Sequence, residues 1–180
     1  MRLGVIVALL ALGLLRATPC AAAGTAGPGF TDPAAYCAAV GTLDRPDSNY
    51  TGPAMPDWIA RALRRVTGAP PDAPLRFFRQ GAWRCDHGRV LACGVGANIP
   101  CFQKAEQSRV PTAAERAFCE QRPDSSVIPA YVASHATIWL WRCRGTEPVI
   151  VRQVLHVDDQ GYPSEFWHVV TPAEGAPLRG

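Results

Sequence analysis

Residues 82–95 read AWRCDHGRVLACGV, and this stretch decides the fold class that we expect. Two strand-like runs flank the turn residues Asp86, His87 and Gly88, which predicts a β-hairpin with a cysteine on each strand. In a regular hairpin Cys85 and Cys93 share a face but lie too far apart for a disulfide, which needs a Cα separation of about 4.4 to 6.8 Å. Each of the two cysteines is therefore expected to pair elsewhere.

The cysteine count predicts a disulfide-stabilised protein. Of the seven cysteines, Cys20 lies in the expected export signal. An even number remains, which predicts three disulfides in an oxidising compartment and leaves no thiol for catalysis or metal binding. A bridge between Cys93 and Cys101 is the easiest to close, and the other connectivities remain open. The predicted disulfide cysteines are Cys37, Cys85, Cys93, Cys101, Cys119 and Cys143.

The first residues have the pattern of a secretory signal peptide. A basic start is followed by an apolar run at residues 3–15 and by small residues at 21–23. The apolar run is shorter than the roughly twenty residues that span a bilayer, so no transmembrane anchor is expected. We predict that residues 1–23 are removed, that the mature chain starts at Gly24, and that it is periplasmic or secreted.

The charge of the mature chain excludes one class of partner. The whole chain has 18 basic and 15 acidic residues, and the signal peptide removes only basic ones, Arg2 and Arg16. The mature chain is then almost neutral and has no electrostatic reason to bind nucleic acid. The bias toward arginine, alanine, proline and glycine is typical of a bacterial protein from a GC-rich genome.

Hydrophobic periodicity and capping residues predict an α+β domain. Three short helices are expected at residues 33–40, 56–66 and 112–121, and the last begins with a capping box, Thr112 to Glu115. Strands are expected at residues 135–143, 149–157 and 162–170. Together with the hairpin they give an antiparallel sheet of about five strands. We predict one domain over residues 24–170 and a flexible tail at 171–180.

The expected register of the last three strands divides the sheet into two faces. Turns are expected at residues 144–146 and at Asp159-Gln160, which places Cys143 opposite Glu147 and His168 opposite Val151. One face would form the core. The other face is too apolar to be fully solvated, so we expect helix 56–66 or helix 112–121 to cover it. If it is exposed instead, it would bind a protein or envelope partner, because aromatic and arginine side chains anchor interfaces. The predicted binding residues are Leu140, Arg142, Arg152 and Trp167.

Motifs for metal or cofactor chemistry are missing from the sequence. No Cys-x-x-Cys pair occurs, so no metal site is predicted. The glycines at 94 and 96 do not form a phosphate loop, because Pro100 blocks the helix that would follow. No cofactor is predicted. His168 and His135 are the candidates for a catalytic role, although a hydrogen-bonded core histidine is the simpler interpretation of His168.

Three stretches, residues 36–42, 96–101 and 137–143, resemble an uncharacterised family of small exported cysteine-containing bacterial proteins. This resemblance covers most of the mature chain and implies export and a single domain, but it carries over no catalytic residue. The cysteine-bearing hairpin alone is similar to periplasmic lysozyme inhibitors of the small β-barrel type. The inhibitory segment of that family has no match in this sequence, so the similarity suggests only a class of protein. The sequence thus favours a noncatalytic binding or envelope-associated protein. The alternatives are a small hydrolase that uses a histidine and an acidic residue, and a structural or accessory subunit.

Overall fold

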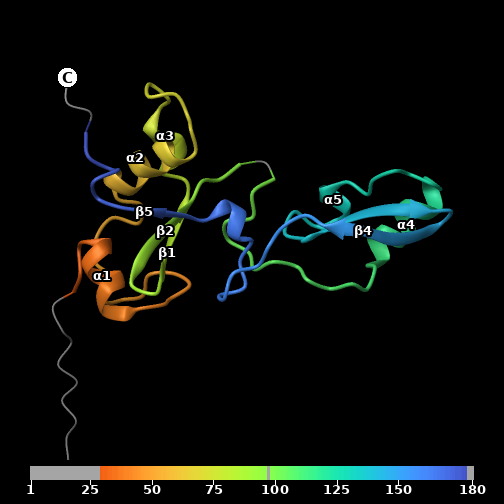
Figure 1. Ribbon diagram of the computed structural model, residues 1–180, viewed down its shortest axis with the longest axis horizontal. Coiled ribbons are helices and arrows are strands. Elements are labelled where there is room, and N and C mark those ends of the chain that lie inside the picture. Colours follow the sequence, from red (N-terminus) through yellow and green to blue (C-terminus); the bar gives the residue numbers. More distant parts are fainter. Residues whose placement is uncertain (1–28, 97, 178–180) are drawn as a thin grey trace, which may run out of the picture.

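The computed structural model describes residues 29–96 and 98–177, which form two lobes joined by two chain segments (Figure 1). The predicted signal peptide lies outside the described residues. The proximal lobe comprises α1 (Pro33–Val40), α2 (Asp57–Val66), α3 (Leu75–Phe78), β1 (Ala82–Asp86), β2 (Arg89–Cys93) and β5 (His168–Val170). The distal lobe comprises α4 (Ala113–Gln121), α5 (Ala130–Ala133), β3 (Trp139–Arg144) and β4 (Glu147–Gln153). A short 3-10 helix, Ser164–Phe166, precedes β5.

The predicted hairpin forms the centre of the proximal lobe. Strands β1 and β2 pair antiparallel, from Ala82 opposite Cys93 to Asp86 opposite Arg89. His87 and Gly88 turn the chain with φ angles of 48° and 78°, the left-handed conformation that two-residue hairpin turns require. Strand β5 adds to the other edge of β2, so the strand order is β1-β2-β5.

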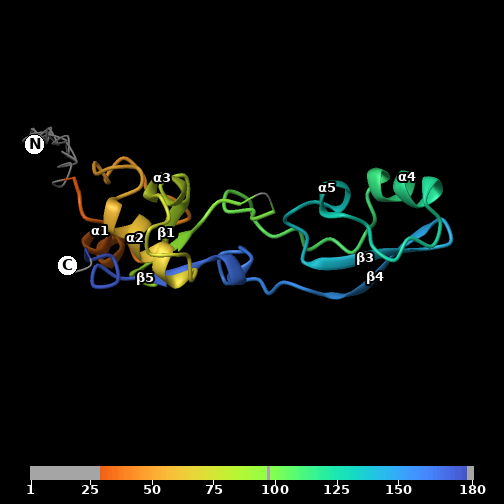
Figure 2. The same ribbon diagram turned by 90° about the horizontal axis from the view of Figure 1, so that it is seen from above.

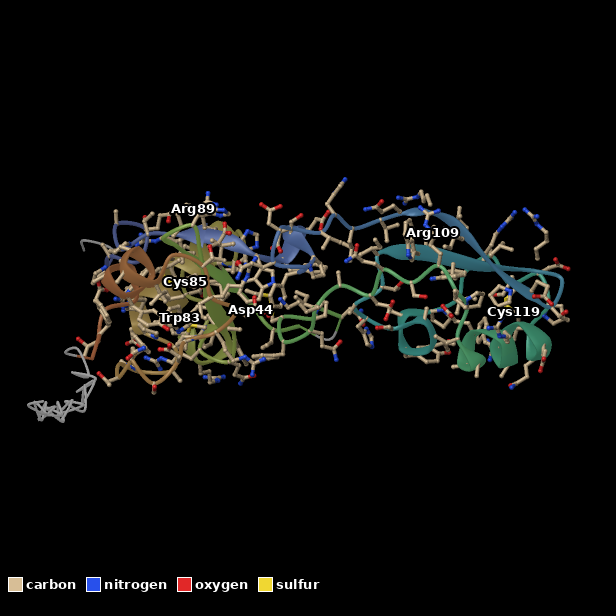
Figure 3. The ribbon with its side chains drawn as sticks, turned by 90° about the horizontal axis from the view of Figure 1, so that it is seen from below. Asp44, Trp83, Cys85, Arg89, Arg109 and Cys119 are labelled. Atoms are coloured by element: carbon tan, nitrogen blue, oxygen red, sulfur yellow. A yellow bond between two sulfur atoms is a disulfide. The ribbon has the colours of Figure 1, made fainter. Side chains whose placement is uncertain are left out.

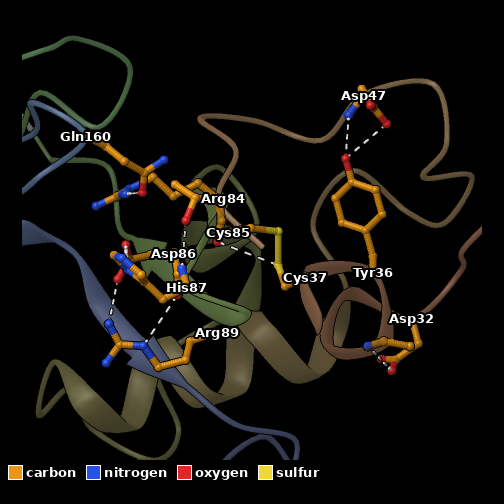
Figure 4. The surroundings of a disulfide bond; sticks show 12 residues. Asp32, Tyr36, Cys37, Asp47, Arg84, Cys85, Asp86, His87, Arg89 and Gln160 are labelled. Atoms are coloured by element: carbon orange, nitrogen blue, oxygen red, sulfur yellow. Dashed lines mark hydrogen bonds and ion pairs between the residues drawn. A yellow bond between two sulfur atoms is a disulfide. The ribbon is translucent and has the colours of Figure 1, made fainter. Parts of the chain in front are cut away.

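Both faces of this three-stranded sheet are covered. On one face α1 and α2 pack against it, and the Cys37–Cys85 disulfide links α1 to β1 with a Cα separation of 5.1 Å (Figure 4). The other face packs against Tyr162 and Trp167. Because side chains alternate along a strand, Trp83 and Cys85 enter the first core while Arg84, between them, faces the second. The buried side chains of the first core include Tyr36, Ile59, Leu63, Trp83, Val90 and Val170.

The distal lobe is a two-stranded hairpin with helices on one side (Figure 2). The Cys119–Cys143 disulfide ties α4 to β3 with a Cα separation of 5.4 Å. Helix α4 begins with the predicted capping box, because the Thr112 side chain accepts from the Glu115 N–H and the Glu115 carboxylate accepts from the Thr112 N–H. The buried core of this lobe is separate from the proximal cores and consists of Cys119, Ile128, Ala133, Ile138, Trp139, Trp141 and Cys143.

The α+β class, the antiparallel pairing and the three disulfides are confirmed, but the single sheet of about five strands is wrong. The described strands form one sheet of three and one of two. The prediction assumed that the last strand folds back on β4 at the turn around Asp159. That turn exists, with Gly161 N donating to Asp158 O, but it lies in the segment that joins the lobes. The chain then continues to β2 in the proximal lobe. The prediction of one domain over residues 24–170 stays a prediction.

The predicted register of the distal hairpin is wrong by one residue. Its turn is Gly145-Thr146, so Arg144 and not Cys143 lies opposite Glu147. A further irregularity between Leu140 and Trp141 shifts the pairing again toward the end of the hairpin. His168 does not oppose Val151 either, because it pairs with Ala92 of β2.

The three predicted helices are confirmed as α1, α2 and α4. The structure adds α3 and α5, of four residues each, which are too short to show a hydrophobic period. The flexible tail expected at residues 171–180 stays a prediction. Residues 171–177 contact α2, where Arg61 Nε donates to the Gly175 carbonyl at 2.6 Å and Arg65 donates to the Glu174 and Ala176 carbonyls.

Candidate binding site at the junction of the lobes

An aromatic pocket of about 260 Å³ opens at the end of the proximal lobe that faces the distal lobe. Four aromatic residues are among those that line it: Trp83, Phe102, Tyr162 and Trp167. They come from β1, from the segment after β2 and from the segment before β5, so only the folded topology brings them together. Asp44 and Arg45 provide charged groups at the same pocket.

Contacts within the wall hold three of the four rings in place. Trp83 is 3% exposed, and its indole N–H donates to the Ala54 carbonyl at 2.8 Å. Tyr162 and Trp167 pack edge to face with centroids 5.3 Å apart. Phe102 differs, since 63% of it is exposed. Tyr162 and Trp167 therefore form an aromatic floor, Trp83 borders the pocket from the other face of the sheet, and Phe102 protrudes beside them.

A fully buried arginine supports this floor from inside the lobe. The Arg84 guanidinium lies 4.8 Å from the centroid of Tyr162 and 4.6 Å from that of Trp167. It donates to the Gln160 side chain and forms an ion pair with Asp158 (Figure 4 shows the contact with Gln160). Asp158 also accepts from the backbone N–H of Tyr162 at 2.9 Å. Arg84 thus ties β1 to the segment that carries the rings.

A second polar contact crosses the junction near the mouth of the pocket. Lys104 Nζ lies 2.5 Å from Asp44 Oδ2 and also stacks on the Tyr162 ring, 4.6 Å from its centroid. The other oxygen of Asp44 accepts from Gln160 Nε2 at 3.1 Å. In Figure 3, Asp44 lies closer than Trp83 to the segments that lead to the distal lobe. Both segments are therefore anchored to the proximal lobe at this pocket.

Phe102 also lines a second hollow, of about 220 Å³, together with Ile99 and His135. The loop that precedes Phe102 is closed by the Cys93–Cys101 disulfide, which confirms the one pairing that the sequence favoured. Within and beside this loop, Val95 is 37% and Ile99 36% exposed. Phe102 thus stands between two hollows on an apolar surface that a disulfide holds in place.

The two candidate catalytic histidines do not meet an acid. His168 is half-buried in β5, and His135 is exposed beside the second hollow. Among residues 29–96 and 98–177, neither has a carboxylate within hydrogen-bonding distance. The hydrolase alternative required such a pair at one of these histidines.

The histidines that do contact acids lie on the surface. His87 contacts Asp86 at 2.8 Å, and His156 contacts Glu165 at 2.7 Å. Burial raises the pKa of Glu165, but hydrogen bonds from the backbone N–H and ring of His156 outweigh it and hold that pKa below its ordinary value. The side chains of His87 and His156 are 66% and 83% exposed, so neither pair lies in a pocket that could enclose a substrate.

The predicted binding residues do not form one site. Leu140 and Arg152 face each other across the distal hairpin, with Arg142 on the same face, whereas Trp167 is buried in the aromatic pocket of the proximal lobe. Neither proposed helix covers that hairpin face. Helix α2 belongs to the other lobe, and α4 is bonded to Cys143, which points away from the Arg142 face. Arg142 and Arg152 are exposed, and Leu140 is half-buried.

Most residues of the pocket could not be predicted from the sequence. Phe102, Asp44 and Arg45 lie in loops without a sequence motif. The sequence around Arg84 does not indicate that both faces of its strand are covered in the fold. The one available signal is the alternation of side chains along a strand, which places Arg84 on the face opposite to that of Trp83 and Cys85. Asp158 lies at the turn that ends at Gly161, and it also neutralises Arg84.

In the described part of the chain, no three histidine, cysteine or acidic side chains are grouped as metal ligands. None of the helices in the same residues has the length and hydrophobicity to cross a bilayer. Comparison with protein-family models, curated proteins and solved structures finds no match, so the resemblance to small exported bacterial proteins stays a prediction.

Proposed function

We propose that this protein is an exported, noncatalytic binding protein and that the aromatic pocket at the junction of the lobes is its binding site. The observation that carries the proposal is a pocket lined by four aromatic residues, of which Phe102 is 63% exposed. Exposed aromatic side chains beside a preformed pocket are typical anchors of an interface. The three disulfides fit an oxidising, extracytoplasmic setting, in which a periplasmic or secreted location is part of the proposal.

The size of the pocket favours a small occupant. At about 260 Å³ it lies just below the range of about 300–1,000 Å³ that is usual for drug-sized ligands. It suits a single ring, carried either by a small compound or by one side chain of a protein or envelope partner. The second hollow across Phe102 would extend the contact with a larger partner.

The proposal can be tested with indole as a neutral ring probe. Isothermal titration should detect weak binding to the wild-type protein, and Ala54→Phe should abolish it, because Ala54 is an exposed residue of the pocket wall. The matched control is Ala113→Phe, which adds the same ring at an exposed position on α4 and should leave binding unchanged. No detectable binding, or binding that Ala54→Phe leaves intact, would contradict the proposed site.

A further inference from the structure

Some charged groups around the aromatic pocket have a partner of opposite charge and one does not, and this difference indicates the charge of the ligand. Aromatic walls beside the Asp44 carboxylate suggest at first a site for a cation, because cations bind over ring faces. Asp44, however, already has partners for both of its oxygens: Lys104 at 2.5 Å and Gln160 at 3.1 Å. Its negative charge is compensated within the protein.

The buried charge beneath the floor is compensated as well. Arg84 is paired with Asp158, so it adds little net field to the pocket. Arg45 remains. Its side chain is exposed at the pocket, and among the described residues its guanidinium has no ion pair, hydrogen bond or ring contact. The charge available to a ligand is therefore positive.

Arg45 also sets the kind of group that it can bind. A guanidinium only donates hydrogen bonds, so its partner must be an acceptor. The planar fork of Arg45 suits a carboxylate.

We infer that the pocket takes an aromatic group bearing a carboxylate, with the ring against the aromatic floor and the carboxylate at Arg45. This inference rests on the proposed function and specifies its ligand class. Two sources supply this chemistry: a free aryl-carboxylic acid, or the C-terminal aromatic residue of a peptide, whose α-carboxylate lies next to its ring.

The requirement for a negative charge on the ligand is tested with two probes, N-acetyl-L-phenylalanine and its amide. The first carries a carboxylate and the second a neutral amide in its place. Titrations followed by NMR should give the acid about fivefold tighter binding than the amide, the effect of one partly solvated ion pair. Arg45→Gln should weaken the acid to the level of the amide and leave the amide unchanged. Arg144→Gln, which removes an exposed arginine of the distal lobe, should change neither.

The source is then decided by comparing phenylacetate with N-acetylglycyl-L-phenylalanine. Tighter binding of the peptide identifies a chain terminus as the ligand, whereas equal or tighter binding of phenylacetate identifies a small acid. The inference is overturned if the amide binds as tightly as the acid, or if benzyltrimethylammonium binds more tightly than either. In both cases the pocket would still bind rings and the proposed function would stand. If none of the ring compounds binds, the proposed function fails together with the inference.

Discussion

The two lobes use the same elements in different ways. The distal lobe is built from a nearly continuous part of the chain, and helices cover one face of its hairpin while Arg142 and Arg152 stay exposed on the other. The sheet of the proximal lobe combines strands that precede the distal lobe in the sequence with one that follows it, because β5 pairs with β2. This sheet packs against other residues on both faces, and aromatic residues from three segments line the pocket beside it. The comparison teaches that the proposed binding surface lies where distant segments of the chain meet.

The largest effect should come from removing the disulfide that closes the longest segment. Cys37–Cys85 spans 48 residues and Cys119–Cys143 spans 24. Replacing Cys37 and Cys85 by alanine should cost about 4 kcal/mol of the free energy of unfolding, from the loop entropy of the unfolded chain. Hydrogen exchange should accelerate in β1, β2 and β5.

The same measurement can break the comparison between the lobes. If they are separate packing units, exchange of the β3 and β4 amides should stay as slow as in the wild-type protein. In the matched double variant, with Cys119 and Cys143 replaced, exchange should accelerate in β3 and β4 and stay slow in β1, β2 and β5. Equal acceleration in both lobes for either variant would mean that they unfold as one unit.

The buried arginine should contribute more than its exposed neighbour on the same hairpin. Arg84→Met leaves Asp158 without its partner and removes the support of two rings, so we expect a loss of about 3 kcal/mol. Arg89→Met breaks an ion pair with Asp86 in which the arginine is 55% exposed, and it should cost less than about 1 kcal/mol. Chemical denaturation compares the two variants. Similar losses would show that Arg84 does not hold the pocket.

The N-caps of α1 and α4 allow a comparison between the lobes in which the expected loss of stability is smaller. Asp32 accepts from Ala35 N at 3.0 Å at the start of α1, and Thr112 accepts from Glu115 N at 3.2 Å at the start of α4. Replacement of either cap by alanine should cost about 1 kcal/mol. Exchange should accelerate only in the lobe that carries the variant, and acceleration in the other lobe would argue against separate cores.

The smallest effect concerns acid and the hairpin turn of the proximal lobe. Burial raises the pKa of Asp86, but Arg89 and His87 outweigh it and hold that pKa below its ordinary value of 3.8. A lowered pKa stabilises the fold above the unfolded value, and this contribution is lost as the pH falls through the folded pKa. Arg89→Gln should therefore destabilise the protein at about pH 6 and less so at about pH 3. A difference in stability that is independent of pH would contradict this assignment.

Local features of the fold were predictable from the sequence, and long-range pairing was not. The β1–β2 turn, the capping box at Thr112 and the stripe of α2 are set by neighbouring residues, and each is confirmed. The pairing of β5 with β2 joins residues almost eighty positions apart, and no local pattern distinguishes it from pairing with β4. The Gly145-Thr146 turn was misjudged by one residue, which was enough to shift the whole register of the distal hairpin.

The candidate site was hidden for the same reason. Trp167 was predicted as a binding residue beside Leu140 and Arg142, because its strand was expected to pair with residues 149–157 and not with β2. Its observed neighbours, Tyr162 and Arg84, follow only from the pairing of β5. Cys93–Cys101 could be favoured in advance because it closes a short loop.

The most direct test of the account is an NMR titration of the ¹⁵N-labelled protein with indole, read at the indole N–H signals of its five tryptophans. Ring currents from a bound probe act over short distances, so the pocket predicts shifts for Trp83 and Trp167. Trp139 and Trp141, in the core of the distal lobe, should not move. Shifts confined to Trp139 and Trp141, or no shift at Trp83 and Trp167 at saturation, would contradict the claim that this protein binds through the pocket at the junction of its lobes.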